Sequence, residues 1–207
     1  PQIPEPWKAP NVLFCANTHP ASQVLVLDQC PSSEITAIDT FMLWIDTEFE
    51  SLSTALRKAD LAILNEEEVC AISGEDFFMK AIGPILSGAC LHGGESAGRG
   101  PSGLVIKRGS SGVFAHLPCG IISLPSFPIS EVVDPTGCGD SFAGALLANM
   151  SKRKGILNDI ESMRDAMVHA TVTSSFTIQG LGTNKLQGLE RGIYHARMDS
   201  FRRIVGL

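Results

Sequence analysis

Residues 132–147 read Val-Val-Asp-Pro-Thr-Gly-Cys-Gly-Asp-Ser-Phe-Ala-Gly-Ala-Leu-Leu, and this stretch is the most informative part of the sequence. Two β-branched residues and an Asp-Pro pair end an extended segment, because the residue before a proline is driven away from the helical region. Small residues follow, and a run of small and apolar residues then predicts a buried helix. The stretch therefore predicts a strand, a tight turn and the first turn of a helix.

Gly137, Cys138 and Gly139 carry little side-chain bulk, so a ligand can approach their backbone N–H groups at the positive end of the helix dipole. A helix N-terminus of this kind binds an anion. Asp140 lies beside the anion site, and a carboxylate there repels phosphate, so we expect it to accept a proton from an attacking hydroxyl group. An equally open interpretation is that Asp140 only caps the helix.

Residues 134–147 resemble the C-terminal signature of the PfkB/ribokinase family of carbohydrate and nucleoside kinases. Cys138 departs from the Ala, Gly or Ser that is usual in the family, but it is still small. The resemblance implies a ribokinase-like α/β fold, with a central, mainly parallel sheet and helices on both faces. It also implies that Asp140 is the catalytic base and that the amides of 137–139 stabilise the transferring phosphoryl group.

The resemblance further implies that this chain corresponds to the C-terminal two-thirds of such a kinase. The opening Pro-Gln-Ile-Pro-Glu-Pro is typical of a linker and has no initiator Met. We therefore expect a piece of a longer protein, with the N-terminal lid and the first strands outside it. A sheet edge truncated in this way exposes unpaired backbone groups, which favours pairing of two copies as a homodimer.

Composition sets the class of protein. With 207 residues, of which 44% are hydrophobic, the chain is expected to form a single domain over residues 1–207. The net charge of −6 and the lack of a basic cluster argue against nucleic acid or an anionic membrane as the partner. Six cysteines without a Cys-x-x-Cys pair indicate reduced thiols in a cytoplasmic protein, although Cys138 at a helix N-terminus would have a lowered pKa.

Apolar runs alternate with helical patterns along the chain, which predicts a parallel sheet covered by helices. Strands are expected at 11–16, 35–39, 61–64 and 121–124, and a strand, tight turn and return strand within 104–114. Helices are expected at 21–29, 47–58, 75–86, 159–179 and 186–205. The Gly/Ser-rich stretch 87–103 is interpreted as a mobile insertion. In such folds the ligand binds beyond the carboxyl ends of the strands.

The sequence Asn65-Glu-Glu-Glu68 follows one of these strands. It resembles the family's Asn-x-x-Glu motif, which implies that Glu68 holds Mg²⁺ through its water shell and that Asn65 faces the phosphates. Hard oxygen ligands suit Mg²⁺, which keeps most of its waters. The alternative is that the three glutamates only complement a helix dipole.

A Gly-x-x-Gly turn at Gly109 and Gly112 resembles a family turn whose backbone borders the nucleotide. Lys107, at the end of the preceding strand, stands where the family often has Thr. It contacts ATP phosphates or is a solvated strand end, and both interpretations stay open.

The long helix at 159–179 and its glycine-containing exit resemble the part of the family that lines the adenine pocket. The resemblance places His169 at a base-contacting position, although a helix histidine also commonly has a structural role. It further implies a monovalent cation, K⁺, between the loop opened by the signature aspartate and the helix exit. The matching positions are Asp134, Thr136, Ser175, Ile178 and Gly180.

These observations predict an ATP- and Mg²⁺-dependent kinase acting on a hydroxymethyl group of a small sugar or nucleoside. There is no Walker Gly-x-x-x-x-Gly-Lys-Ser/Thr motif, and no strand is followed by Gly-x-Gly-x-x-Gly, which argues against a P-loop enzyme and a dinucleotide-binding oxidoreductase. The rival interpretation is a non-catalytic nucleotide-binding module or an inactive fragment. The resemblance implies that most acceptor contacts lie in the N-terminal part expected outside this chain, so the acceptor stays undefined. Phe41 and Met42 stand where the family often has Asn, so we expect a polar contact to the acceptor to be lost.

Overall fold

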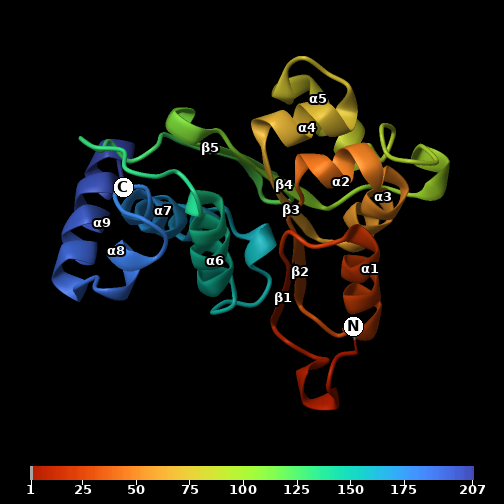
Figure 1. Ribbon diagram of the computed structural model, residues 1–207, viewed down its shortest axis with the longest axis horizontal. Coiled ribbons are helices and arrows are strands. Elements are labelled where there is room, and N and C mark those ends of the chain that lie inside the picture. Colours follow the sequence, from red (N-terminus) through yellow and green to blue (C-terminus); the bar gives the residue numbers. More distant parts are fainter. Residues whose placement is uncertain (1) are drawn as a thin grey trace. The chain divides into compact units, whose positions relative to one another are not determined.

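Figure 1 shows the computed structural model of the chain, which describes residues 2–207. Within these residues six strands form one sheet in the order β1-β2-β3-β4-β5-β6. The strands are β1 Val12–Cys15, β2 Ile35–Ile38, β3 Leu61–Asn65, β4 Gly103–Lys107, β5 Val113–Leu117 and β6 Gly120–Leu124. The first four pair in parallel. The last three follow one another through links too short for a parallel crossover, so the sheet is mostly parallel, and the expected ribokinase-like α/β class is confirmed.

The helices are α1 Pro20–Gln29, α2 Met42–Thr47, α3 Phe49–Lys58, α4 Glu66–Ser73, α5 Phe78–Ser87, α6 Cys138–Met150, α7 Ile160–Thr177, α8 Asn184–Gln187 and α9 Arg191–Val205. Helices α1 to α5 alternate with the parallel strands as expected, whereas α6 to α9 all follow the last strand. Short 3-10 turns span Glu5–Trp7, Glu95–Ala97, Gly109–Ser111 and Ile156–Asn158.

Three local expectations were wrong. The segment before the signature turn is not a strand, because residues 125–137 pair with no neighbouring strand. The helix expected at 186–205 is interrupted, since α8 ends at the cap residue Gly188 and α9 begins at Arg191. The helix expected from residue 75 begins only at Phe78, after α4 has ended at Gly74 in the left-handed conformation with φ of 73°.

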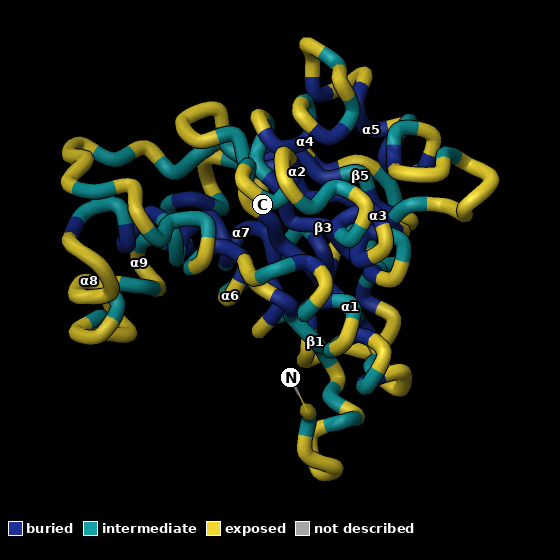
Figure 2. The backbone as a smooth tube through the Cα atoms, turned by 45° about the vertical axis from the view of Figure 1, so that its right-hand side comes forward, coloured by how far each residue is buried: buried dark blue, intermediate teal, exposed yellow. Residues whose placement is uncertain are grey.

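The chain divides into two compact units, and the expectation of one domain stays a prediction. The first unit comprises the residues up to 107 together with 115–121. Its centre is the strand pair β3 and β4, whose residues are buried except at their carboxyl ends. Helices α1 and α3 pack together beside β1 and β2 (Figure 1). Figure 2 shows β3 as buried backbone.

The stretch 87–103 belongs to this first unit, and side chains of α3 hydrogen-bond to its backbone, while its mobility stays a prediction. The Arg57 side chain in α3 donates hydrogen bonds to the carbonyl oxygens of His92 and Gly94, each at 3.0 Å, and to that of Gly98. The Ser53 hydroxyl accepts a hydrogen bond of 2.9 Å from the backbone N–H of His92. The glycine-rich composition suggested freedom, but α3 supplies partners for the backbone.

The second unit comprises 108–114 and 122–207. Helix α6 packs along α7, and α9 packs on α7 as well (Figure 1). Residues buried along α7, such as Met163, Met167 and Val172, form its core with Leu146 and Met150 of α6. Helix α7 is therefore the central element of this unit.

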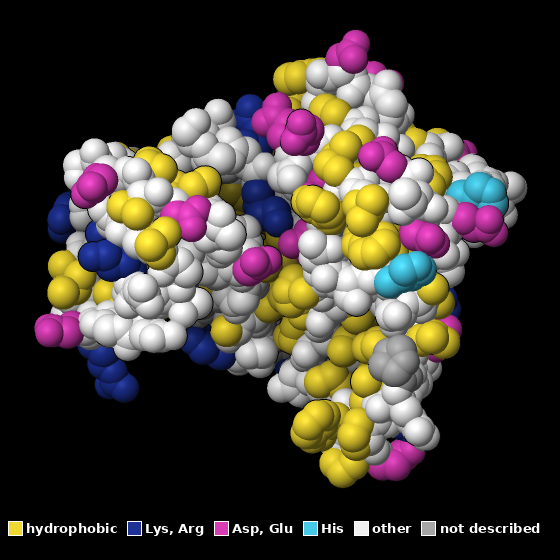
Figure 3. Space-filling view, in the orientation of Figure 1, with side chains coloured by type: hydrophobic (Ala, Val, Ile, Leu, Met, Phe, Trp, Pro, Cys, Tyr) yellow, Lys and Arg dark blue, Asp and Glu magenta, His cyan; other side chains and the backbone are white. Residues whose placement is uncertain are grey.

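Some large hydrophobic side chains stay exposed, among them Trp7, Phe41, Leu43 and Phe77. Figure 3 shows hydrophobic side chains over α2 and over the N-terminal segment. Within residues 2–207, no helix is both long enough and apolar enough to cross a bilayer. All six cysteines are free thiols.

Candidate active site

Asn65 and Glu68 form a reciprocal cap where β3 passes into α4. The Asn65 side-chain oxygen accepts a hydrogen bond of 2.8 Å from the backbone N–H of Glu68, and Glu68 Oε2 accepts one of 2.8 Å from the backbone N–H of Asn65. Such a capping box satisfies two amide groups that the first helical turn leaves without partners. The two residues of the predicted motif are therefore fixed in position, at the carboxyl end of a parallel strand.

Glu68 is almost completely buried, with 4% of its surface exposed. Burial raises the pKa of its carboxyl group to about 7, and the nearby Asp39 carboxylate adds to the rise, whereas the Asn65 hydrogen bond and Lys107 oppose it. A bound cation would reverse this effect, because it stabilises the ionised carboxylate. Glu66 and Glu67, more exposed, lie in the same turn and complement the helix dipole.

Lys107 forms an ion pair with Asp39 at the same edge of the sheet. Its Nζ lies 3.1 Å from Asp39 Oδ2, and the two side chains are 19% and 8% exposed. Asp39 Oδ1 also accepts a hydrogen bond of 2.8 Å from the backbone N–H of Thr40, whose own buried hydroxyl oxygen has no hydrogen-bond partner within the described chain. Neither of the two interpretations of Lys107 included an ion pair with Asp39. The position of Asp39 directly after a buried strand could have suggested that the two charged side chains meet at the same edge of the sheet.

We call Asp39, Glu68 and Lys107 the strand-end cluster. All three follow or end parallel strands of the first unit, so their backbone positions come from the sheet. Two carboxylates and an unpartnered hydroxyl provide the hard oxygen atoms that Mg²⁺ and its water ligands bind. The oxygen chemistry of the cluster is compatible with an ion held through its water ligands, while Lys107 already pairs with Asp39, and the described residues contain no group of three or more His, Cys, Asp or Glu side chains that could hold a metal ion directly.

Gly109 and Gly112 form the turn between β4 and β5. The Arg108 backbone N–H donates a hydrogen bond of 2.8 Å to the Gly112 carbonyl. Gly112 has a φ of 91°, and a Cβ atom there would lie 2.1 Å from the carbonyl oxygen of Leu124. Only glycine fits at this position, so the backbone alone accounts for the glycine, whether or not a ligand binds nearby.

The signature turn begins α6 as predicted. Gly137 is in the left-handed conformation with φ of 80°, and Cys138, Gly139 and Asp140 make up the first helical turn. The Asp140 side chain is exposed, which leaves it accessible to a substrate hydroxyl group. Burial and the Asp134 carboxylate raise the pKa of the Cys138 thiol, which is the opposite of the direction expected for a helix N-terminus.

A hydrogen-bonded chain links this turn to the end of α7. The Thr177 hydroxyl donates to the Ser141 hydroxyl at 2.8 Å, and the latter donates to the Cys138 carbonyl oxygen at 3.1 Å. Thr177 is the last residue of α7, so the two helix ends are coupled by side chains. No sequence signal had pointed to this pair.

His169 lies in the middle of α7 and pairs with Tyr194 of α9. Its Nδ1 is 2.7 Å from the tyrosine hydroxyl oxygen, and the two rings are stacked. Burial lowers the pKa of His169 and raises that of Tyr194. This contact gives the histidine a structural partner, and its predicted contact with a nucleotide base stays a prediction.

Hydrogen bonds connect only some of the five positions expected to hold a monovalent cation. The Ile178 carbonyl accepts backbone hydrogen bonds from Val133, at 2.9 Å, and from Asp134, at 3.2 Å. The Thr136 N–H donates to Asp134 Oδ1 at 2.9 Å, which lowers the pKa of the Asp134 carboxyl group. The turn containing Asp134 and Thr136 is therefore tied to the exit of α7. Ser175 and Gly180 lie at the same helix end.

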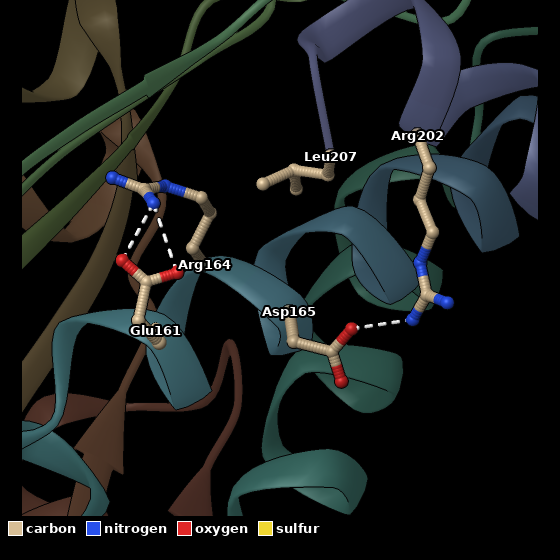
Figure 4. Close-up of a pocket in the computed structure, with 5 residues that line it drawn as sticks. All are labelled: Glu161, Arg164, Asp165, Arg202 and Leu207. Carbon is tan, nitrogen blue, oxygen red and sulfur yellow. Dashed lines mark hydrogen bonds and ion pairs between the residues drawn. The ribbon is translucent and has the colours of Figure 1, made fainter.

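A separate pocket of about 210 Å³ lies along α7 and α9. Figure 4 shows its charged residues in two pairs, Arg164 with Glu161 and Arg202 with Asp165. Each labelled charge has a partner within the pocket, and none of these residues belongs to the predicted site. We therefore do not assign the pocket to the reaction.

Comparison with known proteins identifies the family. Residues 24–187 match the pfkB family carbohydrate kinases. The chain is 28% identical to the cytidine kinase of Thermococcus kodakarensis over 155 residues. The aligned region covers 72% of this chain and 51% of that relative. It is 31% identical over 127 residues to the bifunctional ribokinase/ribose-5-phosphate isomerase A of Fructilactobacillus sanfranciscensis, which covers 61% of this chain and 21% of the relative.

Solved structures share the fold. The fructokinase of Vibrio cholerae O395, in its fructose, ADP and calcium ion bound form, has a TM-score of 0.75 at 18% identity, covering 95% of this chain and 63% of that one. The ribokinase of Giardia lamblia has a TM-score of 0.71 at 18% identity, covering 92% and 60%. This chain therefore belongs to the pfkB family of carbohydrate kinases, and it spans about half or less of the curated relatives it matches.

Proposed function

We propose that this chain is the nucleotide-binding and catalytic part of an ATP-dependent kinase that phosphorylates a hydroxymethyl group of a sugar or nucleoside. The observation that carries the proposal is the start of α6, where Gly137 adopts φ of 80° and Asp140 stands exposed in the first turn. Membership of the pfkB family supports the same reaction class.

In the proposed reaction, Asp140 takes the proton of the attacking hydroxyl group, which makes the oxygen a better nucleophile. The backbone N–H groups of Gly137, Cys138 and Gly139, at the helix N-terminus, stabilise negative charge on the transferring phosphoryl group, and for this the Cys138 N–H exchanges its hydrogen bond of 3.2 Å to the Pro135 carbonyl oxygen for one to the phosphoryl group. Phosphoryl transfer asks mainly for positioning and charge stabilisation, which these groups supply without covalent chemistry.

The strand-end cluster would hold Mg²⁺ through its water shell, with Glu68 as the principal carboxylate and Asn65 orienting it. When bound, the ion neutralises charge on the phosphates of ATP. Lys107, engaged with Asp39, adds a positive charge at the same edge for the nucleotide. We assign the turn at Gly109 and Gly112, together with His169, to the nucleotide pocket.

Calorimetric titration of the chain with ADP and with a non-hydrolysable ATP analogue, in the presence of Mg²⁺, tests the proposal. We expect saturable binding by the native sequence. Gly139→Val should weaken it strongly, because the added side chain blocks access to the amides. Gly144→Val is the matched control: Gly144 lies in the same helix, is exposed, and a Cβ there meets no atom within 4 Å.

Equal binding by both glycine variants would contradict the assignment of the anion site to the start of α6. No binding by a folded chain would contradict the proposal for these 207 residues. In that case, a non-catalytic module would be the better description.

A further inference from the structure

Arg197 of α9 reaches the C-terminal end of α7. Its Nη1 donates hydrogen bonds of 3.0 Å to both the carbonyl oxygen and the hydroxyl oxygen of Ser175, and its Nη2 donates one of 2.8 Å to Gln179 Oε1. Ser175 is 6% exposed. A guanidinium with three oxygen acceptors in a fixed geometry is held far more tightly than a surface arginine.

Two aromatic rings hold the same guanidinium. The Arg197 Cζ atom lies 3.6 Å from the ring centre of Phe176 and 5.1 Å from that of Phe127. The electron-rich ring faces attract the cation, and they shield it from water. Three hydrogen bonds and two ring contacts therefore hold the guanidinium at the C-terminal end of α7.

A cation suits this position for a general reason. The last carbonyl groups of a helix lack intrahelical partners and carry the negative end of the helix dipole. The resemblance to the family predicted a bound monovalent cation here, held partly by the carbonyl groups of Ser175, Ile178 and Gly180.

The residues present do not fit a bound monovalent cation. The Ser175 carbonyl oxygen accepts from Arg197, and the Ile178 carbonyl oxygen already accepts two backbone hydrogen bonds, from Val133 and Asp134. A Cβ atom at Gly180 would lie 2.6 Å from Lys185 Cγ, so a second basic side chain packs against that residue. At Ser175 and Ile178 a metal cation would compete for engaged carbonyl oxygens, and the guanidinium bound to Ser175 would repel it.

This helix end also supports the proposed anion site. Thr177, two residues after Ser175, donates its hydroxyl hydrogen to Ser141, which in turn bonds to the Cys138 carbonyl. A change in the last turn of α7 is therefore transmitted to the first turn of α6 through two hydrogen bonds.

We propose that Arg197 is a positioning residue that replaces a bound monovalent cation at the end of α7, so that the nucleotide site of this chain is independent of potassium. The inference rests on the proposed function for its nucleotide site. The absence of a potassium site, however, can be measured without nucleotide.

The first experiment is thermal unfolding at constant ionic strength, in potassium chloride and in tetramethylammonium chloride, whose cation is too large for a carbonyl cage. We expect the native chain to have the same Tm in both salts. Arg197→Ala should have a lower Tm that potassium partly restores, because the substitution frees the Ser175 carbonyl and removes the repelling charge. Arg203→Ala, an exposed arginine of the same helix, is the matched control and should resemble the native chain.

The second experiment is ADP titration of the same proteins in both salts. The native chain should bind with one affinity in either salt, and Arg197→Ala should bind about tenfold more weakly in tetramethylammonium. Arg197→Lys, which keeps the charge, should recover much of that loss. A purely structural role predicts no recovery by potassium or by lysine.

The outcomes separate the two proposals. Potassium-specific stabilisation or tighter ADP binding of the native chain would overturn the inference about Arg197 and leave the kinase function standing. No ADP binding in either salt would count against the proposed function, while the melting curves would still decide whether a potassium site exists. An Arg197→Ala chain that melts and binds like the native one would also overturn the inference.

Discussion

The strand-end cluster of the first unit and the signature turn of the second unit differ in the burial of their carboxylates. In the cluster, Glu68 is 4% exposed, and Asp39 is paired with Lys107. In the turn, Asp140 is exposed at the start of a helix whose backbone supplies the positive end. Burial makes the charges of the cluster depend on one another, whereas an exposed carboxylate keeps its charge at little cost. Substitutions in the cluster should therefore appear in stability, and those in the turn should appear in turnover.

The largest expected effect is that of Asp140→Asn on turnover. Asparagine keeps the shape of the side chain but accepts no proton, so we expect kcat to fall by about 10² or more. Nucleotide affinity and the free energy of unfolding should stay nearly unchanged, because the side chain is exposed. Steady-state kinetics with calorimetric ADP binding and urea unfolding measure all three.

An active Asp140→Asn chain would remove the catalytic role of this residue. A strongly destabilised variant would show instead that Asp140 is mainly a helix cap.

The next effect is the pH dependence that Glu68 gives to stability. The pKa of its carboxyl group rises from an ordinary 4.5 to about 7 in the folded protein. Between these values the folded protein holds a proton that the unfolded chain has released. Stability therefore falls as the pH rises from 4.5 to 7, by about 3 kcal/mol in total.

Glu68→Gln should remove this loss, because glutamine does not ionise and its side-chain oxygen can still accept from the Asn65 N–H. Urea unfolding at pH 4.5 and pH 7.5, followed by tryptophan fluorescence, measures the difference between the two proteins. Glu67→Gln changes an exposed neighbour in the same turn and is the matched control. An equal pH dependence of the native chain and Glu68→Gln would refute the buried, protonated carboxyl group.

The smallest of the three effects is that of Lys107→Met on stability. Methionine fills a similar volume but leaves Asp39 buried without its cation, so we expect a loss of about 2 kcal/mol. Lys58→Met is the control, since Lys58 pairs with Asp28 at the surface, where the two side chains are 40% and 52% exposed. It should cost about 0.5 kcal/mol. Equal losses at the two lysines would show that the strand-end cluster behaves as a surface pair.

Local signals were sufficient for much of the fold and for part of the site. Asn65 and Glu68 are three residues apart, so the sequence alone contains the capping box that places them. Gly137 and the residues after it likewise specify a helix start within a few positions. The four parallel strands follow from apolar runs that occur between helical patterns.

Local patterns failed where the deciding partner is distant or where two signals compete. Gly188 ended α8 inside a stretch with one continuous helical pattern. The glycine-rich composition of 87–103 does not show that its backbone carbonyl groups accept hydrogen bonds from Arg57, which lies in another helix. Cys138 has a raised pKa because burial and Asp134 outweigh the helix dipole.

The positions of Asn65, Glu68 and Gly137 to Asp140 could be predicted from the sequence because each depends on neighbours a few residues away, and the parallel sheet could be predicted because apolar runs alternate with helical patterns. The pairing of Lys107 with Asp39 and that of Arg197 with Ser175 are visible only in the folded molecule. These partners are far apart along the chain. Which charged groups pair depends on their distance and burial in the folded molecule, and no local sequence pattern specifies either.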